Sequence, residues 1–153
     1  MSFMSNLDQE SIGGGTVALV SGSGSIATML YQACSRVICS VASIGNEAVT
    51  TAAQFIEYAI EQPETSSVIV FLEAIRDHQS MVGALQRANA HCKPVAILKG
   101  GRTERSAQVA ATHTGALVDD DTAFQALLEH HNAIRADSIE ELKLLSEIGR
   151  AHV

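Results

Sequence analysis

The feature of this sequence that most constrains its fold is a regular alternation between two kinds of segment. Runs of consecutive apolar, mostly β-branched residues lie at 16–20, 37–43, 67–72 and 95–99, with a weaker one at 133–136. Apolar residues at successive positions are typical of strands that are covered on both faces. Between these runs lie helix-like stretches at 25–34, 49–60, 80–90, 122–131 and 139–148. Ser138, followed three residues later by Glu141, has the pattern of a capping box opening the last helix.

This alternation predicts an α/β fold in which an open parallel sheet has helices on both faces. Five strands favour the flavodoxin-like order 2-1-3-4-5. The length of 153 residues suits one domain with a single core. Residues 1–12 are polar and aperiodic and precede three glycines, so we expect a flexible lead-in there and the domain proper at 13–153.

Charge and composition exclude several classes of function. The formal net charge of -7 would repel a nucleic-acid backbone or an anionic membrane. The apolar runs are too short to span a bilayer, and the N-terminus lacks the features of a signal peptide. The 3 cysteines show no metal-ligand spacing and suit a reducing compartment. We therefore expect a cytoplasmic protein with no metal site, no nucleic-acid partner and no membrane partner.

The loop after the first strand has the composition of a phosphate-binding turn. It consists of Ser21, Gly22, Ser23, Gly24 and Ser25. In open parallel sheets, ligands bind beyond the carboxyl ends of the strands, where this loop is expected. Glycine lets the backbone approach a ligand closely, serine hydroxyls are donors, and a following helix presents unpaired N–H groups to an anion. The sequence therefore predicts a site for a phosphate or a similar anion.

Other interpretations of the same loop remain open. The simplest is a tight strand–helix turn with a serine cap. Gly22, Gly24 and Ala27 also fit the Gly-x-Gly-x-x-Ala pattern of dinucleotide-binding folds, with Glu47 near the expected position of the acidic partner. A flavin-phosphate loop is a further alternative, although aromatic residues make up only 4% of the chain and few are available to sandwich a flavin.

Two further candidate residues follow the third and fourth strands. Glu73 comes directly after the third strand, where it is either a solvated or capping acid or a carboxylate that orients an imidazole. His113 lies in a glycine-flanked segment after the fourth strand, with Thr114 and Gly115 beside it. An imidazole with a pKa near ~6.5 is neutral at physiological pH, and a carboxylate on one ring nitrogen leaves the other as a nucleophile. These residues could therefore form a phosphoryl acceptor, His113, oriented by Glu73. The alternative is that His113 is an ordinary surface or hydrogen-bonded histidine.

Several motifs in fixed order resemble one family. They read VALVSGSG from Val17, SIGN from Ser43, FLEAIRD from Phe71, KPVAILKGGR from Lys93 and THTGAL from Thr112. Together they resemble the succinyl-CoA-ligase-like flavodoxin domain of NDP-forming acyl-CoA synthetases, which include acetate-CoA ligases and succinyl-CoA synthetase. The resemblance covers almost the whole chain, from about residue 15 to about residue 148.

The resemblance implies a phosphoryl relay between an acyl phosphate and ADP or GDP, with His113 as the carrier and Glu73 as its orienting carboxylate. It implies that Ser21, Gly22, Ser23, Gly24, Ser25, Thr114 and Gly115 bind the phosphoryl group. Gly22, Ala74 and His78 depart from the family's common pattern, which bears on substrate fit more than on the phosphoryl step.

The family also implies what the chain would need around it. CoA and ADP or ATP, with magnesium, are substrates of the complete enzyme and would be bound mainly by other domains. The chain has no resemblance to a CoA-binding Rossmann domain or an ATP-grasp domain. It is therefore expected to be an acid-CoA ligase fragment or subunit, inactive alone, that acts on a small carboxylic acid within an oligomeric enzyme. A non-catalytic module that binds acyl-CoA or nucleotide is the alternative.

Overall fold

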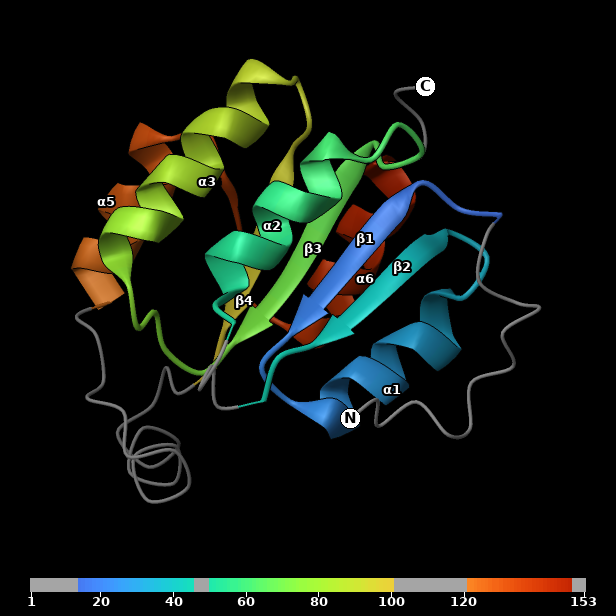
Figure 1. Ribbon diagram of the computed structural model, residues 1–153. Helices are drawn as coiled ribbons and strands as arrows, with labels where there is room; N and C mark the ends of the chain where they lie inside the picture. Colours follow the sequence, from blue (N-terminus) through green and yellow to red (C-terminus); the bar gives the residue numbers. More distant parts are fainter. Residues whose placement is uncertain (1–13, 46–49, 101–120, 150–153) are drawn as a thin grey trace.

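The computed structural model describes residues 14–45, 50–100 and 121–149 (Figure 1). The strands are β1 (Val17–Ser21), β2 (Ile38–Ser43), β3 (Ser67–Leu72), β4 (Val95–Lys99) and β5 (Ile134–Ala136). The helices are α1 (Gly24–Cys34), α2 (Ala52–Glu61), α3 (His78–Ala90), α5 (Asp121–His130) and α6 (Ile139–Gly149). The predicted lead-in at 1–12 lies outside the described residues.

The strands form one parallel sheet in the order β2-β1-β3-β4-β5. This order confirms the predicted flavodoxin-like arrangement. β1 lies between β2 and β3, so the chain moves outward in both directions from it, and the switch point falls at the carboxyl end of β1. The loops after β1, β3 and β4 therefore open at the same edge of the sheet.

Helices cover both faces of the sheet, and each face has its own apolar core. α2, α3 and α5 pack on one face and α1 and α6 on the other (Figure 1). In β1 the side chains alternate between the two cores: Ala18 and Val20 belong to the first, and Val17 and Leu19 to the second. All of these side chains are buried, which explains why the strand reads as a continuous apolar run. No helix in the described part of the chain has the length and apolar character required to cross a membrane.

Polar side chains decide where the helices begin. α2 was expected from residue 49 but begins at Ala52, because Thr51 and Gln54 form a capping box. In it, the Gln54 N–H donates to Thr51 Oγ1 (3.3 Å) and the Thr51 N–H donates to Gln54 Oε1 (3.0 Å). α3 begins at His78, two residues before the expected start, because Asp77 accepts the Ser80 N–H (3.0 Å).

The capping box predicted for α6 is only half formed. Ser138 Oγ accepts a hydrogen bond from the Glu141 N–H (3.1 Å), as predicted. The reciprocal bond differs: Glu141 Oε2 accepts from the N–H of Asp137 (2.7 Å), one residue before the capping serine. The carboxylate thus reaches back past Ser138 and ties the end of β5 to the start of α6.

Candidate functional site

The loop between β1 and α1 is shaped from within by Ser21. This residue ends β1 and is fully buried. Its Oγ donates to the carbonyl oxygen of Ser23 (2.8 Å) and accepts from the N–H of Ser23 (3.2 Å). The hydroxyl of Ser21 is therefore used to fold the turn and faces no solvent.

The start of α1 presents donors that the described part of the chain does not use. Ser23 is the N-cap in extended conformation, and its side chain makes no capping bond. Its carbonyl accepts the first helical bond, from the N–H of Ala27 (2.9 Å). The backbone N–H groups of Gly24 and Ser25 have no partner among the described residues, and the first turn contains no acidic side chain. This end of the helix is thus suited to an anion, which would complete its hydrogen bonds and oppose its dipole.

The two exposed residues of this loop lie at the very start of the helix. Gly24 and Ser25 are exposed, whereas Ser23 and Gly22 are partly buried. Ser23 Oγ and Ser25 Oγ lie 3.1 Å apart and share a hydrogen bond. Hydroxyl donors and backbone N–H groups therefore converge on the same accessible corner of the fold.

Neighbouring strands hold this corner in place. Ser21 pairs in register with Ser43 of β2 and with Phe71 of β3. The Gly22 N–H donates to the carbonyl of Phe71 (2.8 Å), and the Ile44 N–H donates to the carbonyl of Ser21 (2.9 Å). Backbone bonds from both sides thus fix the direction in which the loop leaves the sheet.

Glu73 lies at the same edge, two residues beyond Phe71. The residue is partly buried, and its Oε2 atom is fully buried with no hydrogen-bond partner in the described part of the chain. A buried acceptor without a donor costs about 1–3 kcal/mol, so such an atom in a folded protein calls for a reason. A hydrogen-bond donor that is brought to this oxygen during the protein's function would be such a reason.

The remaining predicted site residues cannot be located in the same way. His113, Thr114 and Gly115, and Glu47 of the dinucleotide interpretation, lie outside the described residues. The meeting of His113 with Glu73 therefore stays a prediction. Within the described ranges, no group of three or more His, Cys, Asp or Glu side chains is placed to hold a metal ion.

A second polar cluster on the opposite face of the same edge was not predicted. Lys99 ends β4 and is 5% exposed, with its Nζ 5.1 Å from the centroid of the Phe124 ring. Arg135 of β5 has its guanidinium carbon 5.5 Å from the same centroid. The sequence signal that could have predicted this cluster is a cation in each of two otherwise apolar strands.

Fold and site together define a class. A parallel sheet in this order, with a serine–glycine turn and a helix N-terminus at its switch point, is a flavodoxin-like α/β domain. The chain belongs to the family described as the succinyl-CoA ligase like flavodoxin domain, whose model matches residues 14–148. This assignment confirms the resemblance seen in the sequence.

Two relatives of this chain are a CoA ligase and a CoA synthase. The chain is 35% identical to a 4-hydroxybutyrate–CoA ligase (ADP-forming) from Nitrosopumilus maritimus over 84% of its own length and 19% of that protein. It is 31% identical to a trans-feruloyl-CoA synthase from an unknown prokaryotic organism, over 86% of the chain and 19% of that protein. The chain therefore spans about a fifth of the length of these two relatives.

Solved structures share the fold. An acetyl-coenzyme A synthetase from Ca. Korarchaeum cryptofilum, solved in complex with phosphate and ADP, superposes with a TM-score of 0.83 at 24% identity. The match covers 91% of this chain and 31% of that one. An ATP citrate lyase from Methanosaeta concilii gives a TM-score of 0.71 at 18% identity, over 90% of this chain and 24% of that one. At these identities the likeness concerns the fold.

Proposed function

We propose that this chain is the phosphohistidine domain of an NDP-forming acyl-CoA synthetase. In this proposal His113 takes a phosphoryl group from an acyl phosphate and passes it to ADP or GDP, or runs the two steps in reverse. The observation that supports it most is the family assignment over residues 14–148. The unused donors at the start of α1 and the buried Glu73 Oε2, which has no hydrogen-bond partner among the described residues, add to it.

The first step forms one bond and breaks one. A ring nitrogen of His113 attacks the phosphorus atom, and the bond from phosphorus to the acyl oxygen breaks, so that the electron pair leaves with the carboxylate product. The second ring nitrogen carries a proton, which Glu73 would accept as a hydrogen bond, stabilising the positive charge that develops on the ring. In the second step a terminal phosphate oxygen of ADP or GDP attacks the same phosphorus and releases the neutral imidazole.

The loop between β1 and α1 would hold the phosphoryl group during both steps. The N–H groups of Gly24 and Ser25 and the hydroxyls of Ser23 and Ser25 are the donors for its oxygens. Ser21 and Gly22 would act indirectly, because their hydrogen bonds set the shape and direction of the loop. Thr114 and Gly115 would complete the site from the side of His113.

Other domains must deliver and remove the phosphoryl group. The named relatives are about five times as long as the matched segment. We propose that CoA and the nucleotide, with its magnesium, bind mainly to such further domains, and that this chain alone has no ligase activity. The relatives carry the names of a feruloyl-CoA synthase, a 4-hydroxybutyrate–CoA ligase and an acetate–CoA ligase, so a test should offer several carboxylic acids.

The test places residues 14–148 of this chain in the corresponding segment of the Nitrosopumilus enzyme and supplies ATP labelled on its terminal phosphate. We expect a protein-bound label that is stable to base and labile to acid, as a phosphohistidine is. His113→Asn should abolish this label. Addition of the carboxylic acid substrate and CoA should remove the label from the chimera without that substitution.

The matched control is His91→Asn. His91 is an exposed histidine at the C-terminal end of α3, and its replacement should leave the label at full level. If the label persisted in His113→Asn, the relay would be wrong. An unlabelled chimera, together with binding of acyl-CoA or nucleotide to residues 14–148 alone, would instead favour the non-catalytic binding module.

A further inference from the structure

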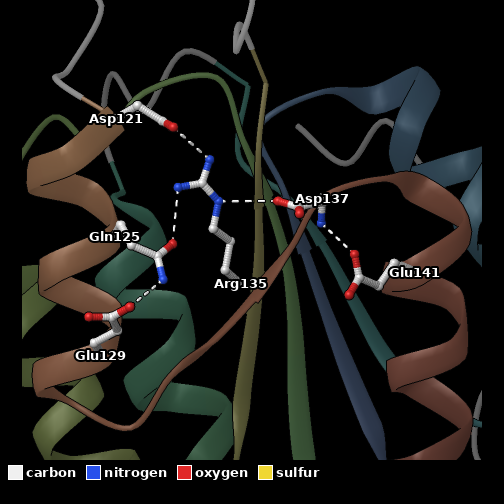
Figure 2. Close-up of polar contacts among 6 residues, drawn as sticks. All are labelled: Asp121, Gln125, Glu129, Arg135, Asp137 and Glu141. Carbon is white, nitrogen blue, oxygen red and sulfur yellow. Dashed lines mark hydrogen bonds and ion pairs between the residues drawn. The ribbon is translucent and has the colours of Figure 1, made fainter.

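Arg135 is the centre of a polar cluster at the edge of the sheet that carries the candidate site (Figure 2). Its Nη2 donates to both carboxylate oxygens of Asp121, at 2.7 and 2.9 Å, and its Nη1 donates to Gln125 Oε1 at 3.1 Å. Its Nε lies 3.3 Å from the carboxylate of Asp137. Figure 2 shows the guanidinium between the first turns of α5 and the start of α6, with every nitrogen engaged.

The contacts of Arg135 orient neighbouring chain segments more than they raise the free energy of unfolding. The Arg135 side chain is only 13% exposed, but the carboxylates of Asp121 and Asp137 are 55% and 60% exposed. Solvent screens ion pairs with such exposed partners, so their contribution to the free energy of unfolding is small. A planar guanidinium with its donors in fixed directions is well suited to holding separate chain segments at a defined angle.

The cluster continues into the core through Phe124. This ring is buried, and it lies under both Arg135 and Lys99, the last residue of β4. Two apolar side chains would cover a phenyl ring without the cost of desolvating two cations. Core stability alone therefore does not account for the pair, whereas joining β4, β5 and α5 at one point does.

The cluster joins the two places where one chain segment begins and ends, which are the end of β4 and the start of α5. Residues 101–120 connect Gly100, which follows β4, to Asp121, the first residue of α5. On the outgoing side, Lys99 lies on the Phe124 ring and the Gly100 N–H donates to the carbonyl of Leu72 (2.7 Å). On the returning side, Arg135 holds Asp121. Both attachments are thus tied to the same ring.

We propose that Arg135 is a positioning residue for phosphoryl transfer, acting through Asp121 and Phe124. This inference rests on the proposed function, because His113 belongs to the segment whose two attachments the cluster ties together. A shift of Asp121 would displace the point where that segment continues into α5, and a displacement of about 1 Å at a reacting atom can cost on the order of 10²-fold in rate. Arg135 touches no reacting group in this proposal.

The experiment uses the chimeric enzyme with Arg135→Gln, Asp121→Ala and the double variant. Asp121 is exposed, so Asp121→Ala is expected to fold even if loss of the partly buried arginine is harmful. We expect the maximal rate of His113 labelling to fall on the order of tenfold in each variant. The ATP concentration for half-maximal labelling should stay unchanged, because the nucleotide is bound elsewhere. The double variant should be no slower than the slower single one, since both break the same contact.

Arg87→Gln is the matched control. It removes the ion pair of Arg87 with Glu61, whose side chains are 51% and 54% exposed on α3 and α2, and it should leave labelling at the wild-type rate. Arg135→Lys keeps the charge but cannot engage both Asp121 and Gln125, so it should recover only part of the rate.

Hydrogen exchange gives a readout that does not depend on activity. Amides in the first turn of α5 should exchange on the order of tenfold faster in Arg135→Gln, with those of α3 unchanged. Unaltered exchange there, or labelling at the wild-type rate in Arg135→Gln, would overturn the role of Arg135. An unlabelled wild-type chimera would count against the phosphohistidine proposal instead, and exchange would then decide the role of Arg135 in anchoring α5.

Discussion

The backbone N–H of Gly22 donates a 2.8 Å hydrogen bond to the carbonyl oxygen of Phe71. This bond extends the pairing of β1 and β3 by one step beyond the carboxyl end of β1. It brings the serine–glycine turn and the strand that leads to Glu73 into one rigid corner. The candidate site therefore rests on two strands and not on a loop alone.

The first prediction concerns the donors of α1. Gly24→Pro removes one backbone N–H at the first helical position, where proline is well tolerated. The preceding residue, Ser23, already has φ -125° and ψ 125°, which suits a residue before proline. We expect the melting temperature to hold while phosphoryl label accumulates to a lower level in the chimeric enzyme.

Gly24→Ala is the control for that change, because it keeps the N–H group. A Cβ at Gly24 would meet Ser43 Oγ at 3.7 Å, an ordinary van der Waals contact. Labelling in Gly24→Ala should match the wild type. If Gly24→Pro labelled as well as Gly24→Ala, the helix end would not be the phosphoryl-binding element.

Glu73→Gln is expected to slow phosphoryl labelling on the order of 10²-fold without lowering stability. The carboxylate would orient the imidazole and stabilise its charge, which a neutral amide does poorly. Because Glu73 Oε2 has no hydrogen-bond partner among the described residues, the change breaks no bond found there. Quenched-flow labelling and urea denaturation measure the two effects. Glu64→Gln, at an exposed carboxylate, should change neither, and a normal labelling rate in Glu73→Gln would remove Glu73 from the mechanism.

The same substitution should have opposite effects at two glycines. Gly83 lies within α3 and a Cβ there meets nothing within 4 Å, so Gly83→Ala should stabilise the fold by roughly 0.5–1 kcal/mol. At Gly15 a Cβ would lie 2.1 Å from the carbonyl carbon of Val37, so Gly15→Ala should destabilise it by about 1–3 kcal/mol. Urea midpoints that moved in the same direction would contradict this packing.

Asp77 predicts a pH dependence of stability. Hydrogen bonds from the Ser80 hydroxyl (2.6 Å) and the Ser80 N–H (3.0 Å) lower the pKa of Asp77 below its ordinary value. A lowered pKa means that the cap stabilises the fold when the carboxylate is charged, above the unfolded-state pKa near ~4, and that this stabilisation is lost as the pH falls through the folded-state pKa. The stability difference between wild type and Asp77→Asn should therefore shrink as the pH falls below about 4. A difference that stayed constant from neutral to acid pH would exclude this assignment.

The sheet could be predicted because its signal is local. Residues 67–72 and 95–99 were expected as strands and are strands, since apolar runs covered on both faces are bounded by polar turns. Helix starts were less accurate, because single side-chain bonds decide them. Because Thr51 caps α2, this helix begins at Ala52 and not at residue 49. Because Asp77 caps α3, that helix begins at His78 and not at residue 80.

The site could be predicted only in part, for a different reason. The composition of residues 21–25 indicated an anion site, but not that the Ser21 hydroxyl would be turned inward. The contacts of Arg135 with Asp121 join residues of different elements, and no periodic pattern encodes such a pair. The placement of His113 opposite Glu73 remains a prediction from the order of the strands.

The place of β1 between β2 and β3 bears on how the site forms during synthesis. Ser21 and Phe71 are neighbours in space, yet α1, β2 and α2 are synthesised between them. Pairing of segments so far apart in sequence is slow, because loop closure must precede any contact that rewards it. When α1 has left the ribosome but β3 has not, the turn is present without the hydrogen bond from Gly22 to Phe71 that fixes it. The turn should therefore reach its final shape late and abruptly as the nascent chain lengthens past Phe71.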